Sequence, residues 1–146
     1  AFELSRSGFK TKAIEQYSVL STSYFNDGND MFLFAKELYN VNQLQKAKAV
    51  LSFAKTKFAS NEVYKLSASI ESELGRYKNV EEDLLKVIYM IPNRMQPRLN
   101  MMEFYLQQKD TLQATNWAKS IINMPVKIPS ETTKAIQQRV KAFLQL

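Results

Sequence analysis

The chain has few side chains that could carry out catalysis. Neither histidine nor cysteine occurs among its 146 residues, which removes the usual general bases, thiol nucleophiles and preferred zinc ligands. Its three glycines, Gly8, Gly28 and Gly75, lie far apart and cannot form a glycine-rich loop that binds phosphate. The sequence therefore predicts a protein without catalytic, cofactor-binding or metal-binding residues.

The densest acidic cluster is Glu81–Glu82–Asp83. Carboxylates alone can bind a metal ion, but we expect these three in the first turn of a helix at 77–90. Negative charge is favourable at that end of the helix dipole. We therefore interpret the cluster as helix-stabilising rather than as a ligand set.

The net charge of +6 comes mainly from the last third of the chain, where residues 94–146 carry eight basic and three acidic side chains. These basic residues are scattered and do not follow one element with stacking aromatics, so nucleic acid is not the expected partner. Solvated surface is the simplest interpretation of the charge. Contact with anionic lipid headgroups or acidic glycans is the alternative.

A column of small or aliphatic residues recurs at intervals of 34, 33 and 34 residues. Two further apolar columns follow it at four and seven residues, which is the spacing of one helix face. Five residues before the first column stands a turn position, where glycine or asparagine would tolerate the left-handed conformation that ends a helix. The columns are Ala13, Ala47, Val80 and Ala114; Tyr17, Leu51, Leu84 and Ala118; and Leu20, Ala54, Val87 and Ile121. The turn positions are Gly8, Asn42, Gly75 and Lys109.

This pattern predicts an all-α fold built from helical hairpins, and its period is that of the tetratricopeptide (TPR) repeat family, which the chain resembles. The resemblance implies a right-handed superhelical array of about 3.5 hairpins within a single domain, 1–146, because such a unit buries its apolar face only against a neighbour. The predicted repeats are 1–25, 29–60, 61–93 and 95–125. The first is shorter than the others and begins with Ala, so we expect a fragment of a longer protein.

Capping signals and prolines predict the ends of the helices. Asn29 or Asp30 is expected to cap a helix at 30–42, and Ser130 a last helix at 130–145. Residues 124–129 should be extended, because Pro125 and Pro129 disfavour the α region for the residues before them. We interpret the last helix as a cap with a polar outer surface, the alternative being a helix that lies on a membrane surface. Its apolar face is Ile136, Val140, Phe143 and Leu144, and the other expected helices are 10–23, 44–58, 61–74, 77–90, 96–108 and 111–123.

The last half of the chain resembles a narrower group, the C-terminal TPR region of bacterial O-antigen ligase-like membrane proteins. The segments that carry this resemblance are Tyr89–Met90–Ile91–Pro92–Asn93–Arg94, Pro97–Arg98–Leu99, Tyr105, and Met124–Pro125–Val126–Lys127–Ile128–Pro129–Ser130. The resemblance implies a parent enzyme that transfers or polymerises lipid-linked glycans in lipopolysaccharide or surface glycan assembly. It also implies that this part lies on the periplasmic side of the inner membrane. No apolar run in the chain approaches the roughly 20 residues needed to span a bilayer.

TPR arrays bind partners on the concave surface formed by the first helix of each hairpin, so the resemblance places a candidate groove there. An aromatic side chain in this groove could anchor a peptide or could pack in the core, and the sequence leaves both open. The terminal-carboxylate clamp of some arrays is absent, because its positions hold Leu33, Glu62 and Leu66. The candidate groove residues are Phe32, Lys36, Tyr39, Asn40, Lys65, Ser69, Glu73, Leu99, Glu103 and Leu106.

The expected function is that of a non-catalytic protein–protein interaction module. Its partner would be a protein or peptide segment, such as its own membrane domain or another envelope glycan-assembly protein. Two alternatives stay open: a structural cap that packs on its own membrane domain, and direct contact with glycan or lipid headgroups.

Overall fold

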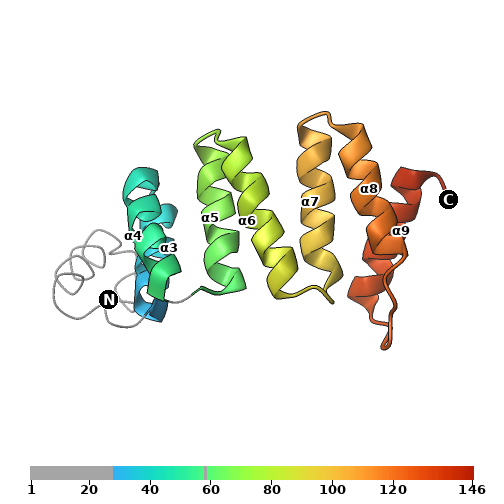
Figure 1. The fold of residues 1–146 in the computed structure, drawn as a ribbon, viewed down its shortest axis with the longest axis horizontal. Helices are drawn as coiled ribbons and strands as arrows, with labels where there is room; N and C mark the ends of the chain where they lie inside the picture. Colours follow the sequence, from blue (N-terminus) through green and yellow to red (C-terminus); the bar gives the residue numbers. More distant parts are fainter. Residues whose placement is uncertain (1–27, 58) are drawn as a thin grey trace. The chain divides into compact units, whose positions relative to one another are not determined.

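The computed structural model describes residues 28–57 and 59–146, which form seven α-helices and no strand (Figure 1). The predicted repeat at 1–25, with Gly8, Ala13, Tyr17 and Leu20, lies outside the described residues. No helix of the described part is both long and apolar enough to span a membrane. The helices are α3 (Gly28–Asn40), α4 (Leu44–Lys57), α5 (Asn61–Glu73), α6 (Tyr77–Met90), α7 (Met95–Gln107), α8 (Thr111–Ile122) and α9 (Glu131–Leu144).

The chain divides into two compact units, residues 1–83 and residues 84–146. We call these the N-terminal unit and the C-terminal unit, and the border between them falls inside α6. In the N-terminal unit α3 contacts both α4 and α5, and in the C-terminal unit α9 contacts both α7 and α8. The predicted single domain and its right-handed superhelix stay predictions.

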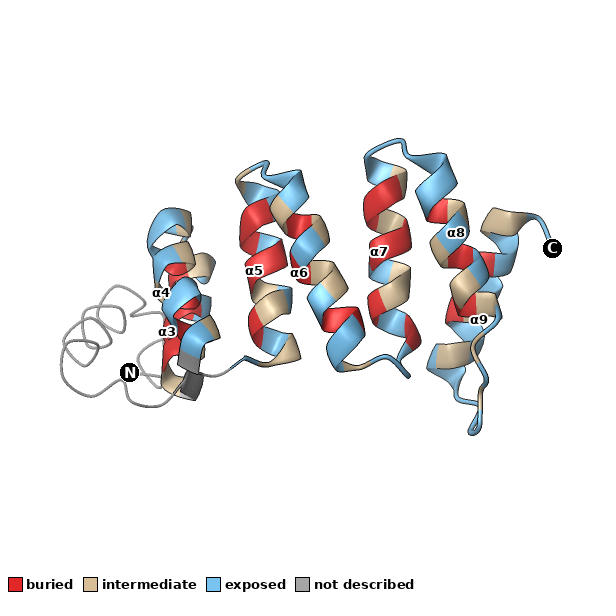
Figure 2. Cartoon of the chain, viewed as in Figure 1, coloured by how far each residue is buried: buried red, intermediate tan, exposed pale blue. Residues whose placement is uncertain are grey.

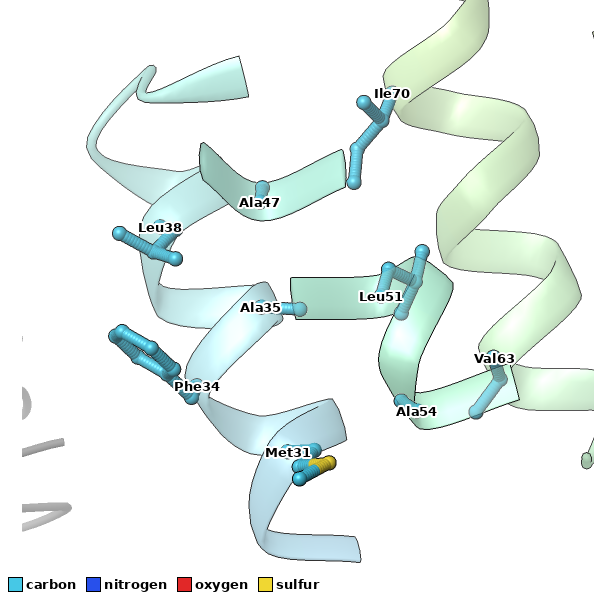
Figure 3. Packing of buried hydrophobic residues seen from close by; sticks show 9 residues of the cluster. All are labelled: Met31, Phe34, Ala35, Leu38, Ala47, Leu51, Ala54, Val63 and Ile70. Atoms are coloured by element: carbon cyan, nitrogen blue, oxygen red, sulfur yellow. The ribbon is translucent and has the colours of Figure 1, made fainter. Parts of the chain in front are cut away.

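The core cluster of the N-terminal unit consists of residues from α3, α4 and α5, and Figure 3 shows Phe34 and Leu38 on the side of α3 that points away from α5. The three column residues of α4, Ala47, Leu51 and Ala54, are all buried. Figure 3 shows Leu51 pointing toward the α5 helix, which contributes Val63 and Ile70 to the cluster. Because two of the three column residues are alanines, the neighbouring helices can approach closely, and this explains why the repeat keeps small residues there. The α3 residues of the cluster are Met31, Phe34, Ala35 and Leu38.

The core of the C-terminal unit follows the same pattern (Figure 2). The column residues Ala114, Ala118 and Ile121 of α8 are fully buried, and Ile136 and Val140 of α9 are buried as predicted. The helix α6 belongs to both units: of its column residues, Val80 of the N-terminal unit and Val87 of the C-terminal unit are buried, but Leu84 is only half-buried. The columns therefore mark buried positions in the described repeats, with Leu84 as the exception.

The three predicted turn positions within the described residues take the left-handed conformation, with φ of 63° at Asn42, 73° at Gly75 and 61° at Lys109. In each turn the next residue donates its N–H to a carbonyl five residues back, at 2.9 Å: Gln43 to Leu38, Arg76 to Glu71, and Asp110 to Tyr105. This is the bonding of the Schellman motif, which satisfies carbonyls at the helix end. The turn at Lys109 forms the same motif without a glycine or asparagine.

The beginnings of the helices confirm one capping prediction and correct another. Ser130 is the N-cap of α9, and its side chain accepts a hydrogen bond from the Thr133 N–H. The expectation that Asn29 or Asp30 caps a helix is wrong, because α3 begins at Gly28 and both residues lie in its first turn. The segment 124–130 contains neither helix nor strand.

Candidate functional site

The N-terminal unit has a groove of about 410 Å³ between α3 and α5. Six of the ten predicted groove residues line it together, because they recur every three or four residues along one face of each helix. The structure adds two lining residues that the prediction left out, Glu62 and Leu66. Their spacing from Ser69 is seven and three residues, so the same helical periodicity would have found them. The complete lining is Phe32, Lys36, Tyr39, Asn40, Glu62, Lys65, Leu66 and Ser69.

The apolar part of the groove consists of Phe32, Tyr39 and Leu66. All three are partly buried and pack against the core cluster of the N-terminal unit. The packing interpretation of the two aromatic residues is therefore confirmed, and their role as anchors for a ligand stays a prediction. Phe32 and Tyr39 keep part of their surface exposed, and both line the groove.

The polar rim of the groove is rich in positive charge. Lys36 and Lys65 are exposed, and neither forms an ion pair with any residue in the described ranges. The Ser69 hydroxyl is used within its own helix, where it donates to the Lys65 carbonyl oxygen at 3.2 Å. Glu62 is the acidic member of the lining. The groove thus combines an apolar floor with two lysines that can bind a carboxylate.

The other four candidates do not line this groove. Glu73 is exposed near the end of α5. Leu99, Glu103 and Leu106 lie on α7, in the C-terminal unit, and all three are partly buried. The Glu103 carboxylate pairs with the Arg139 guanidinium of α9 at 3.0 Å, so its contact connects two helices.

The acidic cluster at 81–83 does not act as predicted. Because α6 begins at Tyr77, its first turn contains no acidic residue, and the proposed helix-dipole role is wrong. Asp83 instead is buried. Its Oδ1 lies 3.1 Å from the Lys55 Nζ, and its Oδ2 accepts a hydrogen bond of 2.6 Å from the Ser67 hydroxyl.

A second buried carboxylate lies beside this cluster. The Glu71 Oε1 pairs with the Lys48 Nζ at 3.2 Å, and its Oε2 accepts a hydrogen bond of 3.0 Å from the Asn79 amide. These groups line a small polar cavity of about 200 Å³ together with Lys55, Ser67 and Asp83. Buried charges of this kind require partners, and each carboxylate here has two.

The arrangement of Lys55, Ser67 and Asp83 superficially suggests a serine nucleophile with a lysine base. Lys55 also donates to the Ser67 oxygen at 2.9 Å and lies over the Tyr64 ring, 5.1 Å from its centroid. An ammonium group paired with a carboxylate cannot accept the serine proton, so the contacts favour a structural role. No group of three metal-ligating side chains occurs in the described part of the chain.

No protein-family model and no curated protein sequence matches the chain. Solved structures do match its fold. A tetratricopeptide repeat protein from Parabacteroides merdae aligns with a TM-score of 0.77 at 14% identity, over 99% of this chain and 57% of that protein. MamA aligns with a TM-score of 0.74 at 12% identity, over 98% of this chain and 83% of that one. The type III secretion translocator chaperone SycD of Yersinia enterocolitica aligns at 0.64 and 12% identity, over 86% of this chain and 96% of that one.

These neighbours show that the fold is that of tetratricopeptide repeat proteins, and the predicted all-α helical repeat is confirmed. At such low identity the likeness concerns the fold alone. The chain spans 57% of the length of the Parabacteroides protein. None of the comparisons supports the narrower resemblance to O-antigen ligase-like proteins.

Proposed function

We propose that the chain is a non-catalytic protein-interaction module whose groove between α3 and α5 binds a peptide segment carrying apolar and acidic side chains. The observation that carries this proposal is the combination, in one groove, of half-buried Phe32 and Tyr39 with Lys36 and Lys65, two lysines that form no ion pair with any described residue. A chaperone of translocator proteins, SycD, has the same fold, which is consistent with recognition of a protein segment.

The apolar floor supplies the affinity in this proposal. Phe32 and Tyr39 already pack against the core, so little side-chain entropy is lost when a ligand covers their free sides. Aromatic side chains held in this way are frequent hot spots of protein interfaces. A groove of about 410 Å³ has room for a few side chains of a peptide, not for a folded domain.

The lysines supply the selectivity. The rim contains two positive charges, on Lys36 and Lys65, and one negative charge, on Glu62. An acidic residue of the ligand could pair with either lysine. Like charges across an interface cost several kcal/mol. A basic segment is therefore disfavoured, while an acidic segment with a phenylalanine or leucine fits both parts of the groove.

A paired peptide library tests this function. Twelve-residue peptides containing phenylalanine or leucine with glutamate would be compared with the same set carrying lysine in place of glutamate. We expect the protein to bind the acidic set. In the variant Lys36→Glu with Lys65→Glu, affinity for the acidic set should fall at least tenfold, about 1.4 kcal/mol or more, and the basic set should be preferred.

The matched control is Lys46→Glu with Lys78→Glu, which makes the same change in net charge at two exposed lysines outside the groove. It should bind the acidic peptides like the wild type. Equal losses in the two variants would mean that total charge, not the groove, governs binding. The groove proposal would then be abandoned.

We also propose, as a separate point, that the chain belongs to an O-antigen ligase-like membrane protein and lies on the periplasmic side of the inner membrane. Its support is the motif block at 89–105 and 124–130. The partner segment would then come from the membrane domain or from another envelope glycan-assembly protein. Direct contact with glycan or lipid headgroups and a structural cap on the membrane domain are the alternatives.

Part of this motif block has a role within the fold. Arg98 donates to the Pro92 carbonyl at 3.2 Å and to the Ser120 hydroxyl, and so connects the α6–α7 junction to α8. Pro97 lies in the first turn of α7, where its missing N–H costs no helix bond.

The gene sequence upstream of residue 1 tests the membrane-protein proposal. About ten apolar spans there would support it, and a run of further repeats would refute it.

A further inference from the structure

The net charge of the protein is confined to one of its two units. Residues 1–83 contain eleven basic and eleven acidic side chains, whereas residues 84–146 contain nine basic and three acidic ones. The C-terminal unit thus carries the whole net charge of +6. Charge of one sign concentrated in this way attracts an anionic partner over distances comparable to the Debye length.

Within the C-terminal unit, four of the nine basic residues lie exposed at one end. Consecutive helices run in opposite directions, so α6 and α8 finish at the edge where α7 and α9 begin (Figure 1). Four exposed basic residues lie at this edge: Arg94 before α7, Lys119 in the last turn of α8, Lys127 in the following loop and Lys134 in the first turn of α9. Glu131, an exposed partner of Lys134 at 3.9 Å, is the acidic residue there.

The same edge exposes apolar side chains. Ile128 is 83% exposed in the loop between α8 and α9, and Tyr89 is 72% exposed in the last turn of α6. Figure 1 shows this loop extending past the ends of α8 and α9. Ile128 directly follows Lys127 in this loop. Transfer of its side chain from water to an apolar environment would be favourable.

We propose that this basic edge, formed by Arg94, Lys119, Lys127 and Lys134 with Tyr89 and Ile128, docks on the surface of an anionic lipid bilayer. The lysines and Arg94 would lie among the lipid phosphates, where basic side chains are attracted to negative surface potential. Ile128 would enter the boundary between headgroups and acyl chains, and Tyr89 would lie at the interface, where tyrosine is enriched.

A bilayer fits these residues better than nucleic acid or an acidic polysaccharide. Both polyanions carry negative charge, and nucleic acids also have bases that stack on aromatic side chains. They offer no apolar phase for an exposed Ile128. The inference depends on the charges and exposures of the C-terminal unit, not on the groove of the N-terminal unit or on any membrane-protein parent.

Vesicle sedimentation of the 146-residue chain tests the proposal. We expect binding to phosphatidylcholine vesicles that contain phosphatidylglycerol and no measurable binding to vesicles of phosphatidylcholine alone. Each basic residue near an anionic surface contributes about fivefold to affinity. Lys127→Glu with Lys134→Glu should therefore weaken binding at least about tenfold, and Ile128→Ser should weaken it about threefold or more.

Two matched controls use the opposite edge of the same unit. Lys109→Glu with Lys141→Glu makes the same charge change at exposed lysines, and Leu112→Ser removes an apolar side chain that is 72% exposed, compared with 83% for Ile128. A helix of 13 residues separates the edges by about 20 Å, more than twice the Debye length of about 8 Å in physiological salt. Both controls should therefore stay within about threefold of the wild type. The groove variant Lys36→Glu with Lys65→Glu should also bind vesicles normally.

Several outcomes would overturn the proposal. These are failure of the wild type to bind anionic vesicles, equal losses at the two edges, or an Ile128→Ser variant that binds as tightly as the wild type. Binding of single-stranded DNA or heparin with the same dependence on Lys127 and Lys134, and without any dependence on Ile128, would identify a polyanion as the partner instead. Circular dichroism of each variant checks that the helices are intact.

Discussion

The turn at Lys109 shows how a single residue can be strained inside a well-formed motif. Its φ of 61° is a conformation that costs a residue with a Cβ atom roughly 1 kcal/mol or more. The hydrogen bonds of its Schellman motif, from Lys109 to Leu106 at 3.0 Å and from Asp110 to Tyr105 at 2.9 Å, hold the backbone there. We therefore expect Lys109→Gly to raise the free energy of unfolding by about 0.5–1 kcal/mol in urea titration.

Lys109→Ala is the control for this prediction, because it removes the same side chain but keeps the Cβ atom and its strain. It should leave the stability within about 0.5 kcal/mol of the wild type. The opposite change, Gly75→Ala at φ 73°, would meet no atom within 4 Å. Its cost is therefore conformational alone, about 1 kcal/mol. A stabilising Gly75→Ala would contradict the argument from backbone strain.

The Asp83 carboxylate gives a prediction about the buried ionic cluster. Asp83→Ala removes the partner of both Lys55 and Ser67 and leaves a partly buried ammonium group unpaired. Removing one partner of a buried ion pair is strongly destabilising. Because Lys55 retains some solvent contact, we expect the free energy of unfolding to fall by about 2–3 kcal/mol. Glu82→Ala, at the exposed neighbouring position, should cost less than about 0.5 kcal/mol in the same thermal or urea unfolding experiment.

For single residues, the sequence predicts the helix face on which a side chain lies, because this depends on spacing. It does not predict the role of a side chain whose contact partner is distant in the sequence. Lys36 and Lys65 could be placed in one groove because both lie on predictable helix faces. Asp83 could not be assigned correctly, since its role depends on Lys55, 28 residues away. Periodicity places Glu103 among the groove candidates, but it does not reveal that the Glu103 carboxylate pairs with Arg139.

At the scale of helices, the predicted helix ends lie within two residues of the observed ones. They could be predicted this closely because local sequence signals determine where a helix stops. Proline, serine and the Schellman turns each act through local backbone geometry, which a single sequence displays. The start of α3 was misplaced because Asn29 and Asp30 are also acceptable inside a first turn. The second helix of each described hairpin, α4, α6 or α8, was predictable because three apolar columns agree along it.

The cap of α9 can be tested at a single serine. The Ser130 hydroxyl accepts from the Thr133 N–H at 3.1 Å, and the Thr133 hydroxyl accepts from the Ser130 N–H at 2.9 Å, forming a capping box. Ser130→Ala should therefore lower the free energy of unfolding by about 1 kcal/mol. The nearby exposed Thr132→Ala should leave it within about 0.5 kcal/mol. Equal melting temperatures for the two variants would show that the capping box does not stabilise α9.

At the scale of the whole molecule, the repeat period predicted the fold class but not the division of the chain into two compact units. The period reports which helices are equivalent, and it contains no information on where contacts between neighbouring repeats are sparse. The division falls within α6, a helix whose column residue Leu84 is only half-buried. The repeat period also does not predict the difference in net charge between the units, although the composition of the two segments contains it.

The small column residues allow a test of whether the two units open separately. Ala47 and Ala114 are fully buried, one in each unit, so replacing either with leucine should overpack its contact and cost about 1–3 kcal/mol. Ala49→Leu, at an exposed position of the same helix as Ala47, is the control and should be nearly neutral.

Because interactions in repeat proteins are mainly between neighbours, Ala47→Leu should reduce amide hydrogen-exchange protection in α3–α5 and leave that of α7–α9 unchanged. Ala114→Leu should do the reverse. A uniform loss of protection along all seven helices in either variant would instead show that the described part of the chain unfolds as one cooperative domain.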